Sequence, residues 1–246
     1  MNRSTTAAPT THDRPLLECV SERLQAVYGI PRCEPSGKPL DELVLTILSQ
    51  HTSDRNAERA FRSLRERFPS WNAVRDARVQ EIAEAIRSGG LADTKAPRIQ
   101  SIVRAALDDH ALDDLGQLPL VDAEARLQTL PGVGPKTAAC VLLFALGRPA
   151  LPVDTHVYRV VRRLGLVDER TSPAEVQREL QLRLPPDQVY AFHINLIRHG
   201  RTICTARKPC CGACPLNDLC AFARQVGHQR GDKADQAAAG VDAGPT

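Results

Sequence analysis

Five of the eight cysteines in this 246-residue chain lie between Cys204 and Cys220. Cys204, Cys211, Cys214 and Cys220 follow the spacing C-x6-C-x2-C-x5-C, and Cys210 stands directly before Cys211. Four thiols in one short loop constrain the fold strongly, because in a reducing compartment such a set binds a metal centre. The loop suits a [4Fe–4S] cluster or a structural zinc ion. The spacing favours iron–sulfur, since structural zinc sites commonly use two close cysteine pairs and this loop has one.

The composition indicates an ordinary globular chain. With 42% hydrophobic and 25% charged residues, it is neither collagen-like nor disordered throughout. The longest apolar run, residues 138–146, is too short to span a bilayer. The N-terminal residues lack the apolar core of a secretory signal. We therefore expect a cytoplasmic protein, and the net charge of +3 decides nothing by itself.

Apolar residues recur every three or four positions along most of the chain, as at Leu16, Val20, Leu24 and Val27. This period indicates amphipathic helices, and no strand-like alternation accompanies it, so the predicted fold is all-α. The two ends, residues 1–13 and 227–246, lack periodic large apolar residues and are predicted to be disordered tails.

Several helix ends are marked in the sequence. Ser172, Pro173 and Glu175 form a capping box that opens a helix. A later helix is expected to stop at Gly200. Asp122 is expected to cap a short helix that ends before Leu130.

Residues 130–138 read Leu-Pro-Gly-Val-Gly-Pro-Lys-Thr-Ala. Gly132 and Gly134, on either side of Val133, permit a tight turn between two helices. The free N–H groups of such a turn form an anion site that can grip a nucleic-acid backbone. No acidic residue lies in 125–153, which favours a phosphate contact over the alternative, a simple glycine-rich turn.

Lys136 and Asp154 are the candidate catalytic pair. The first turn of a helix disfavours positive charge, which suits a nucleophilic lysine at position 136; the alternative is a phosphate-binding lysine. Asp154 opens the next helix, either as its N-cap or as a carboxylate that supports a developing cation, and both roles can hold together. The extended residues 148–153 are long enough to return Asp154 to Lys136. His156 is expected to orient its neighbours.

The cysteine loop also carries basic residues. Arg198, Arg201, Arg207 and Lys208 lie in a stretch, residues 188–217, that contains no acid. A basic run is usually a solvated face, but around a metal loop it favours contact with phosphate.

Three motifs in this order, residues 130–138, Val-Asp-Thr-His at 153–156, and the cysteine ladder, make the chain resemble endonuclease III over residues 15–224. That family comprises iron–sulfur DNA glycosylase/lyases of the helix-hairpin-helix superfamily. The resemblance implies two helical lobes with duplex DNA across the cleft between them, in a monomer that binds no membrane and is associated with the nucleoid.

The implied domains are a six-helix barrel, residues 36–148, and an iron–sulfur domain formed by residues 14–35 and 149–226. The hairpin within the barrel covers about residues 122–147. The resemblance also assigns the cofactor, a [4Fe–4S] cluster that positions the basic loop, and its ligands: Cys204, Cys211, Cys214 and Cys220.

The implied reaction belongs to base excision repair. An oxidised pyrimidine is extruded from the duplex. Lys136 attacks C1′ of the sugar while Asp154 supports the cation, and the base departs. The resulting Schiff base acidifies the 2′ proton, so that the 3′ phosphate leaves by β-elimination and the strand is nicked.

Three residues are implied to fill the duplex after base extrusion. Leu91 falls where the family inserts a leucine. The family glutamine in Leu-Ser-Ala-Gln-Ala-Thr-Asp aligns with His51, because residues 48–54 here read Leu-Ser-Gln-His-Thr-Ser-Asp. Gln50 is shifted by one position, so either Gln50 or His51 contacts the orphaned base. Cys210 also departs from the family, which commonly has a basic residue there.

Two other functions compete with this reading. A monofunctional, adenine-mismatch type of glycosylase shares the cysteine ladder but lacks a lysine at the position of Lys136. A non-catalytic sensor of DNA damage would not need to retain both Lys136 and Asp154.

Overall fold

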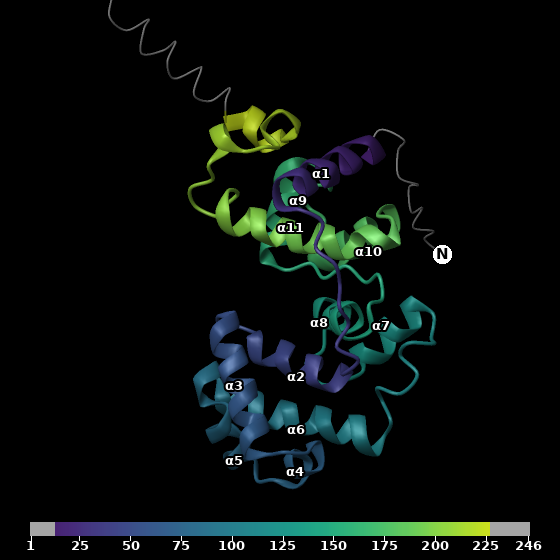
Figure 1. The fold of residues 1–246 in the computed structure, drawn as a ribbon, viewed down its shortest axis with the longest axis vertical. Coiled ribbons are helices and arrows are strands. Elements are labelled where there is room, and N and C mark those ends of the chain that lie inside the picture. The colour runs from purple at the N-terminus through teal and green to yellow at the C-terminus, as the bar shows by residue number, and fades with distance from the viewer. Residues whose placement is uncertain (1–12, 227–246) are drawn as a thin grey trace, which may run out of the picture. The chain divides into compact units, whose positions relative to one another are not determined.

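The computed structural model describes residues 13–226, which divide into two compact units (Figure 1). The unit formed by residues 32–152 is called the inserted unit. The described residues before and after it form the terminal unit. The predicted tails, residues 1–13 and 227–246, lie outside the described residues apart from Asp13, which begins the first helix.

The structure confirms the all-α prediction, since no strand occurs among the described residues. No described helix is long and apolar enough to cross a bilayer. The inserted unit contains α2 (Pro39–Ser49), α3 (Asp54–Arg67), α4 (Trp71–Asp76), α5 (Val79–Ala85), η1 (Arg87–Gly89), α6 (Ala92–Asp108), α7 (Leu120–Gln128), α8 (Pro135–Cys140) and η2 (Val141–Ala145). The terminal unit contains α1 (Asp13–Tyr28), α9 (Thr155–Leu164), α10 (Pro173–Arg183), η3 (Pro186–Gln188), α11 (Val189–Thr202), η4 (Cys211–Ala213) and η5 (Asn217–Leu219).

The inserted unit covers residues 32–152, whereas the resemblance implies a barrel of residues 36–148. The N–H groups of Ser36 and Gly37 donate to carbonyl oxygens of η2 at 3.1 and 2.9 Å. Gly147 leaves room for Pro35, whose Cγ would lie 2.7 Å from a Cβ at position 147. These contacts explain why the segment from residue 32 onward groups with the inserted unit.

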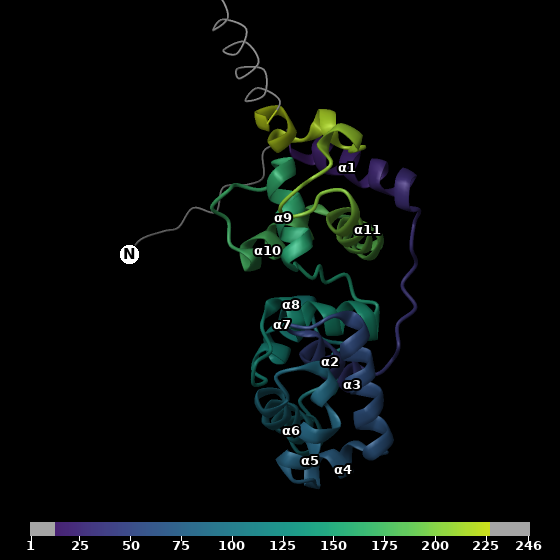
Figure 2. The same ribbon diagram turned by 90° about the vertical axis from the view of Figure 1, so that its left-hand side faces the viewer.

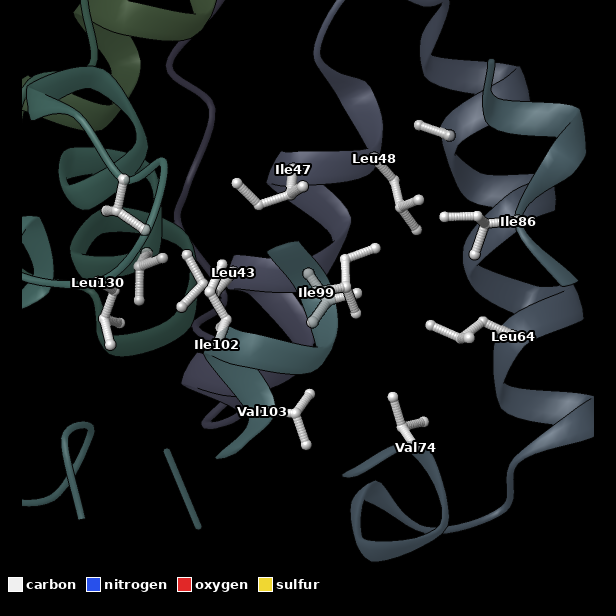
Figure 3. Packing of buried hydrophobic residues seen from close by; sticks show 14 of the residues in the cluster. Leu43, Ile47, Leu48, Leu64, Val74, Ile86, Ile99, Ile102, Val103 and Leu130 are labelled. Atoms are coloured by element: carbon white, nitrogen blue, oxygen red, sulfur yellow. The ribbon is translucent and has the colours of Figure 1, made fainter. Parts of the chain in front are cut away.

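Helices α2 and α6 supply the centre of the core in the inserted unit (Figure 3). Leu43 and Ile47 from α2 and Ile99 and Ile102 from α6 are completely buried. Burying each such side chain contributes about 1.5–3 kcal/mol before entropy is considered. The surrounding helices close around this pair, and the loops that follow α2 and precede α6 therefore start from a rigid base.

In the terminal unit α11 packs against both α1 and α9 (Figure 2). Arg23 on α1 donates to the Asp218 carboxylate at 2.8 Å and to the Pro215 carbonyl at 3.2 Å. The first helix is thus fastened to the cysteine loop, more than 190 positions away in the sequence.

The predicted capping box is confirmed. The Ser172 hydroxyl accepts from the Glu175 N–H at 3.4 Å, and the Glu175 carboxylate accepts from the Ser172 N–H at 2.9 Å. The predicted stop at Gly200 is wrong, since α11 continues to Thr202. Gly200 instead permits close packing, because a Cβ there would lie 3.0 Å from Cβ of His156.

The predicted cap at Asp122 is also wrong. Helix α7 begins at Leu120, with Pro119 at the N-cap position, so Asp122 lies inside the first turn. A carboxylate there still interacts favourably with the helix dipole.

Candidate active site and metal centre

The predicted hairpin joins α7 to α8 in the inserted unit. Leu130 and Val133 are 4% and 6% exposed, so their side chains anchor the turn in the core, where Figure 3 labels Leu130. The Val133 N–H donates to the Leu130 carbonyl at 3.1 Å. Gly132 is exposed and has φ +75°, and Gly134 is the N-cap of α8. The glycines therefore permit the tight turn that the sequence predicts, and Gly132 is exposed at it.

Lys136 lies in the first turn of α8 and is half-buried. Helix α8 packs against α2, which presents Glu42 from its own first turn. Burial raises the pKa of the Glu42 carboxyl above its usual value; the Thr46 hydroxyl, which donates at 3.3 Å, and the charge of Lys136 act in the opposite direction. A carboxyl group thus lies within electrostatic reach of the candidate nucleophile.

Asp154 is the N-cap of α9 in the terminal unit. Its Oδ1 accepts from the N–H groups of His156 at 2.9 Å and Val157 at 2.8 Å, which confirms the predicted capping role. His156 Nδ1 contacts Arg159 Nη2 at 3.1 Å. Lys136 and Asp154 belong to different units, and their proximity stays a prediction.

The loops around Gln50 and Leu91 both contain strained backbone. His51 has φ +56° and Leu91 has φ +50°, a left-handed conformation that non-glycine residues rarely adopt. Both side chains are exposed, Leu91 by 56%. Such strain persists only where the surroundings impose it, and it is frequent at functional sites.

A buried lysine holds these two loops. Lys95 is 3% exposed, and its ammonium donates to the Leu48 carbonyl at 2.7 Å and to the Gly89 carbonyl at 3.0 Å. Leu48 lies at the end of α2 and Gly89 at the end of η1, so one cation satisfies two carbonyls that helix ends leave without partners. The sequence analysis missed Lys95 because nothing local marks it.

Four of the cysteines come together in the terminal unit. Cys204, Cys211, Cys214 and Cys220 line one pocket, whose remaining walls are largely apolar. Burial raises the pKa of the Cys214 and Cys220 thiols. The charges of the other three cysteines raise the pKa of Cys214 further. Four thiolates packed this way repel one another, so the set fits a group that supplies compensating positive charge.

Cys210 also lines the pocket but is exposed. It does not figure among the thiols that shift the pKa of Cys214 or Cys220. N–H donors reach two of the other sulfurs: the Leu216 N–H donates to Cys214 Sγ at 3.4 Å, and Arg163 donates to Cys204 Sγ at 3.3 Å. Hydrogen bonds to cysteine sulfur are typical of iron–sulfur centres.

The predicted basic residues of this region differ in their surroundings. Arg198, Arg201, Arg207 and Lys208 are all exposed. Arg198 donates to the Tyr28 carbonyl at 3.0 Å and so helps to fasten α11 to the end of α1.

Comparisons with known proteins define the class. Residues 44–186 match the model of the HhH-GPD superfamily base excision DNA repair protein. Residues 204–220 match the iron–sulfur binding domain of endonuclease III.

Individual relatives indicate which family within this superfamily the chain resembles. Endonuclease III of Thermotoga maritima is 36% identical over 203 residues, which cover 82% of this chain and 92% of the relative. Endonuclease III of Synechocystis is 40% identical over 187 residues, 76% of this chain and 82% of the relative. A non-covalent endonuclease III–DNA complex superposes with a TM-score of 0.75 at 29% identity, over 87% of this chain and 98% of the other.

The chain belongs to the HhH-GPD superfamily and, within it, to the endonuclease III family. This membership confirms the predicted enzyme class, a DNA glycosylase and AP lyase of base excision repair, and the predicted [4Fe–4S] cofactor.

Proposed function

We propose that this enzyme removes oxidised pyrimidines from duplex DNA and nicks the abasic strand through a Schiff base on Lys136. The position of Lys136 carries the proposal: it stands in the first turn of α8, directly after the hairpin, where positive charge is disfavoured. Its partial exposure leaves the amine accessible to a sugar.

Lys136 and Asp154 have different roles in this reaction. The Lys136 amine forms a bond to C1′ as the bond from C1′ to the base breaks. Asp154, with Oδ1 fixed by two N–H donors, supports the positive charge on the sugar. The amine loses a proton and the sugar ring opens to an imine on Lys136. Loss of the 2′ proton then expels the 3′ phosphate.

DNA binding is assigned to three groups of residues. The backbone of the hairpin at residues 132–134, where Gly132 is exposed, and the exposed Arg201, Arg207 and Lys208 contact phosphates. Leu91, with Gln50 or His51, fills the duplex after base extrusion. The enzyme acts as a monomer on DNA in the cytoplasm.

The thiolates of Cys204, Cys211, Cys214 and Cys220 would hold the cluster, which fixes the fold of the basic loop and breaks no bond of the substrate. Arg163 supports the same loop, because it donates to the carbonyls of Thr205 and Ala206 at 2.8 and 2.9 Å.

A panel of duplexes tests this function. Each carries thymine glycol, an oxidised purine, an adenine mismatch or an abasic site, and each is incubated with and without borohydride. We expect cleavage of the thymine glycol strand and a covalent adduct on reduction. Base release without strand cleavage or adduct would favour the monofunctional alternative.

Two lysine variants sharpen the test. Lys136→Gln should lose the adduct and retain DNA binding. Lys38→Gln, which removes an exposed lysine of the same unit, should retain both. An undiminished adduct in Lys136→Gln would assign the chemistry to another amine.

A further inference from the structure

Arg98, on α6, connects two of the loops assigned to DNA. Its Nη1 donates to Oε1 of Gln50 at 3.1 Å. Its side chain lies directly over Gly132 of the hairpin, since a Cβ on Gly132 would fall 2.5 Å from Arg98 Nε and 2.8 Å from Cζ. The absence of a side chain at position 132 thus gives Arg98 its path to Gln50.

This hydrogen bond fixes which way the Gln50 amide points. A guanidinium can only donate, so the atom facing Arg98 must be the carbonyl oxygen of the amide. The other terminal atom of the amide, the nitrogen with its two N–H donors, is therefore not the atom that faces Arg98. Gln50 and Arg98 are both half-buried, and within residues 13–226 no carboxylate forms an ion pair with Arg98.

We propose that Arg98 is a positioning residue that sets the preference for the base opposite the lesion, by making Gln50 the polar contact of the orphaned base. The proposal rests on the proposed function, which places either Gln50 or His51 at that base. His51 is exposed, and no hydrogen bond comparable to that of Gln50 holds its side chain in the described chain. The hydrogen bond from Arg98 therefore favours Gln50 over His51 as the residue that contacts the orphaned base.

The chemistry of the amide gives the direction of the preference. A side chain that fills the gap left by the extruded base faces the Watson–Crick edge of the orphaned base. On that edge adenine has one acceptor, N1, beside one donor group, N6–H, whereas guanine has one acceptor, O6, beside two donor groups, N1–H and N2–H. With its oxygen engaged by Arg98, Gln50 behaves mainly as a donor. A group that only donates leaves two donor groups of guanine but one of adenine without an acceptor, so Arg98 should shift the enzyme toward lesions opposite adenine.

Single-turnover rates on thymine glycol opposite guanine and opposite adenine test this directly. We expect Arg98→Met to lower the adenine-to-guanine rate ratio about tenfold, the size expected for losing a hydrogen bond to a charged group. Gln50→Ala should lower the ratio similarly, and adding Arg98→Met to Gln50→Ala should change it no further, because the two residues act as one unit.

Two further variants separate orientation from charge. Arg104→Met removes the same charge from an exposed position on α6 and should leave the ratio unchanged. Arg98→Lys keeps the charge but loses the planar fork, and should also lower the ratio. It provides the same test if Arg98→Met proves too unstable to assay.

Additive effects of Arg98→Met and Gln50→Ala would overturn the proposal, as would equal loss on both duplexes or a wild-type ratio in Arg98→Lys. These results would leave borohydride trapping on an abasic strand intact. Failure of the wild-type enzyme to cleave or to form that adduct would instead refute the proposed function.

Discussion

Replacing Lys95 with methionine is expected to lower the free energy of unfolding by about 2 kcal/mol. Methionine has a similar length and stays buried, but it leaves the Leu48 and Gly89 carbonyls without their donor. Each buried acceptor that loses its partner costs about 1–3 kcal/mol. Removing an ammonium from a site that is 3% exposed recovers part of this cost, because the charge no longer has to be desolvated.

The expected change is measurable by thermal unfolding. For a domain of this size about 2 kcal/mol corresponds to a drop in Tm of roughly 4–8 °C. Lys38→Met is the matched control, since it removes an exposed lysine of the same unit and should change the free energy of unfolding by less than about 0.5 kcal/mol. Equal Tm values for the wild type and Lys95→Met would refute the reasoning and would mean that the two carbonyls find other donors.

The pH dependence gives a second readout of the same site. Burial lowers the pKa of Lys95 below its usual 10.5, so just below that value the unfolded chain holds more protons than the folded one. Stability that depends on Lys95 therefore rises as the pH increases through this window. The difference in unfolding free energy between the wild type and Lys95→Met should widen as the pH is raised toward about 10. A constant difference would contradict the lowered pKa.

Three other outcomes follow from the site. Cys210→Ser should retain about four irons per chain by metal analysis, whereas Cys211→Ser should not; the reverse result would exchange the two as ligands. Glu42→Gln should slow borohydride trapping and remove the acid limb of its pH profile, on the hypothesis that the Glu42 carboxylate accepts a proton near Lys136. Because its pKa is raised, Glu42 becomes protonated, and stops accepting, at a higher pH than an ordinary carboxyl. An unchanged profile would exclude proton transfer by Glu42. His51→Gln should leave the relative rates on lesions opposite guanine and adenine unchanged, because Arg98 makes Gln50 the contact of the orphaned base. Equal loss on all substrates with a lower Tm would mean that His51 only packs, and a shift in preference at unchanged stability would contradict the assignment of that contact to Gln50 through Arg98.

Local features of the sequence predicted local features of the structure well. The capping box at Ser172, the turn at Gly132 and the cap at Asp154 each depend on residues within four positions of one another. The helix end predicted at Gly200 is wrong because it also depended on local sequence alone, where a glycine near the end of a helical pattern resembles a C-cap. A glycine stands at position 200 because His156 approaches it closely from another helix. No local sequence pattern encodes that contact.

The supporting residues of the site were missed because their partners are distant in the sequence. Lys95 bonds a carbonyl 47 positions away and Arg98 an amide 48 positions away. On α6 both lie in a pattern that predicts only an amphipathic helix. Glu42 had a weak signal, a carboxylate that follows Asp41 and precedes Thr46 by four residues in a largely apolar helix. Its relation to Lys136 appears only when α2 packs against α8.

The central claim is that Lys136 forms the covalent bond to the sugar. The most direct test is to trap the wild-type enzyme on an abasic strand with borohydride, digest the adduct and locate the modified residue by mass spectrometry. The chain contains only five lysines: Lys38, Lys95, Lys136, Lys208 and Lys233. The account predicts that the nucleotide remnant is on the peptide that contains Lys136. A remnant on another lysine or on the N-terminal amine, or the absence of any adduct, would contradict it.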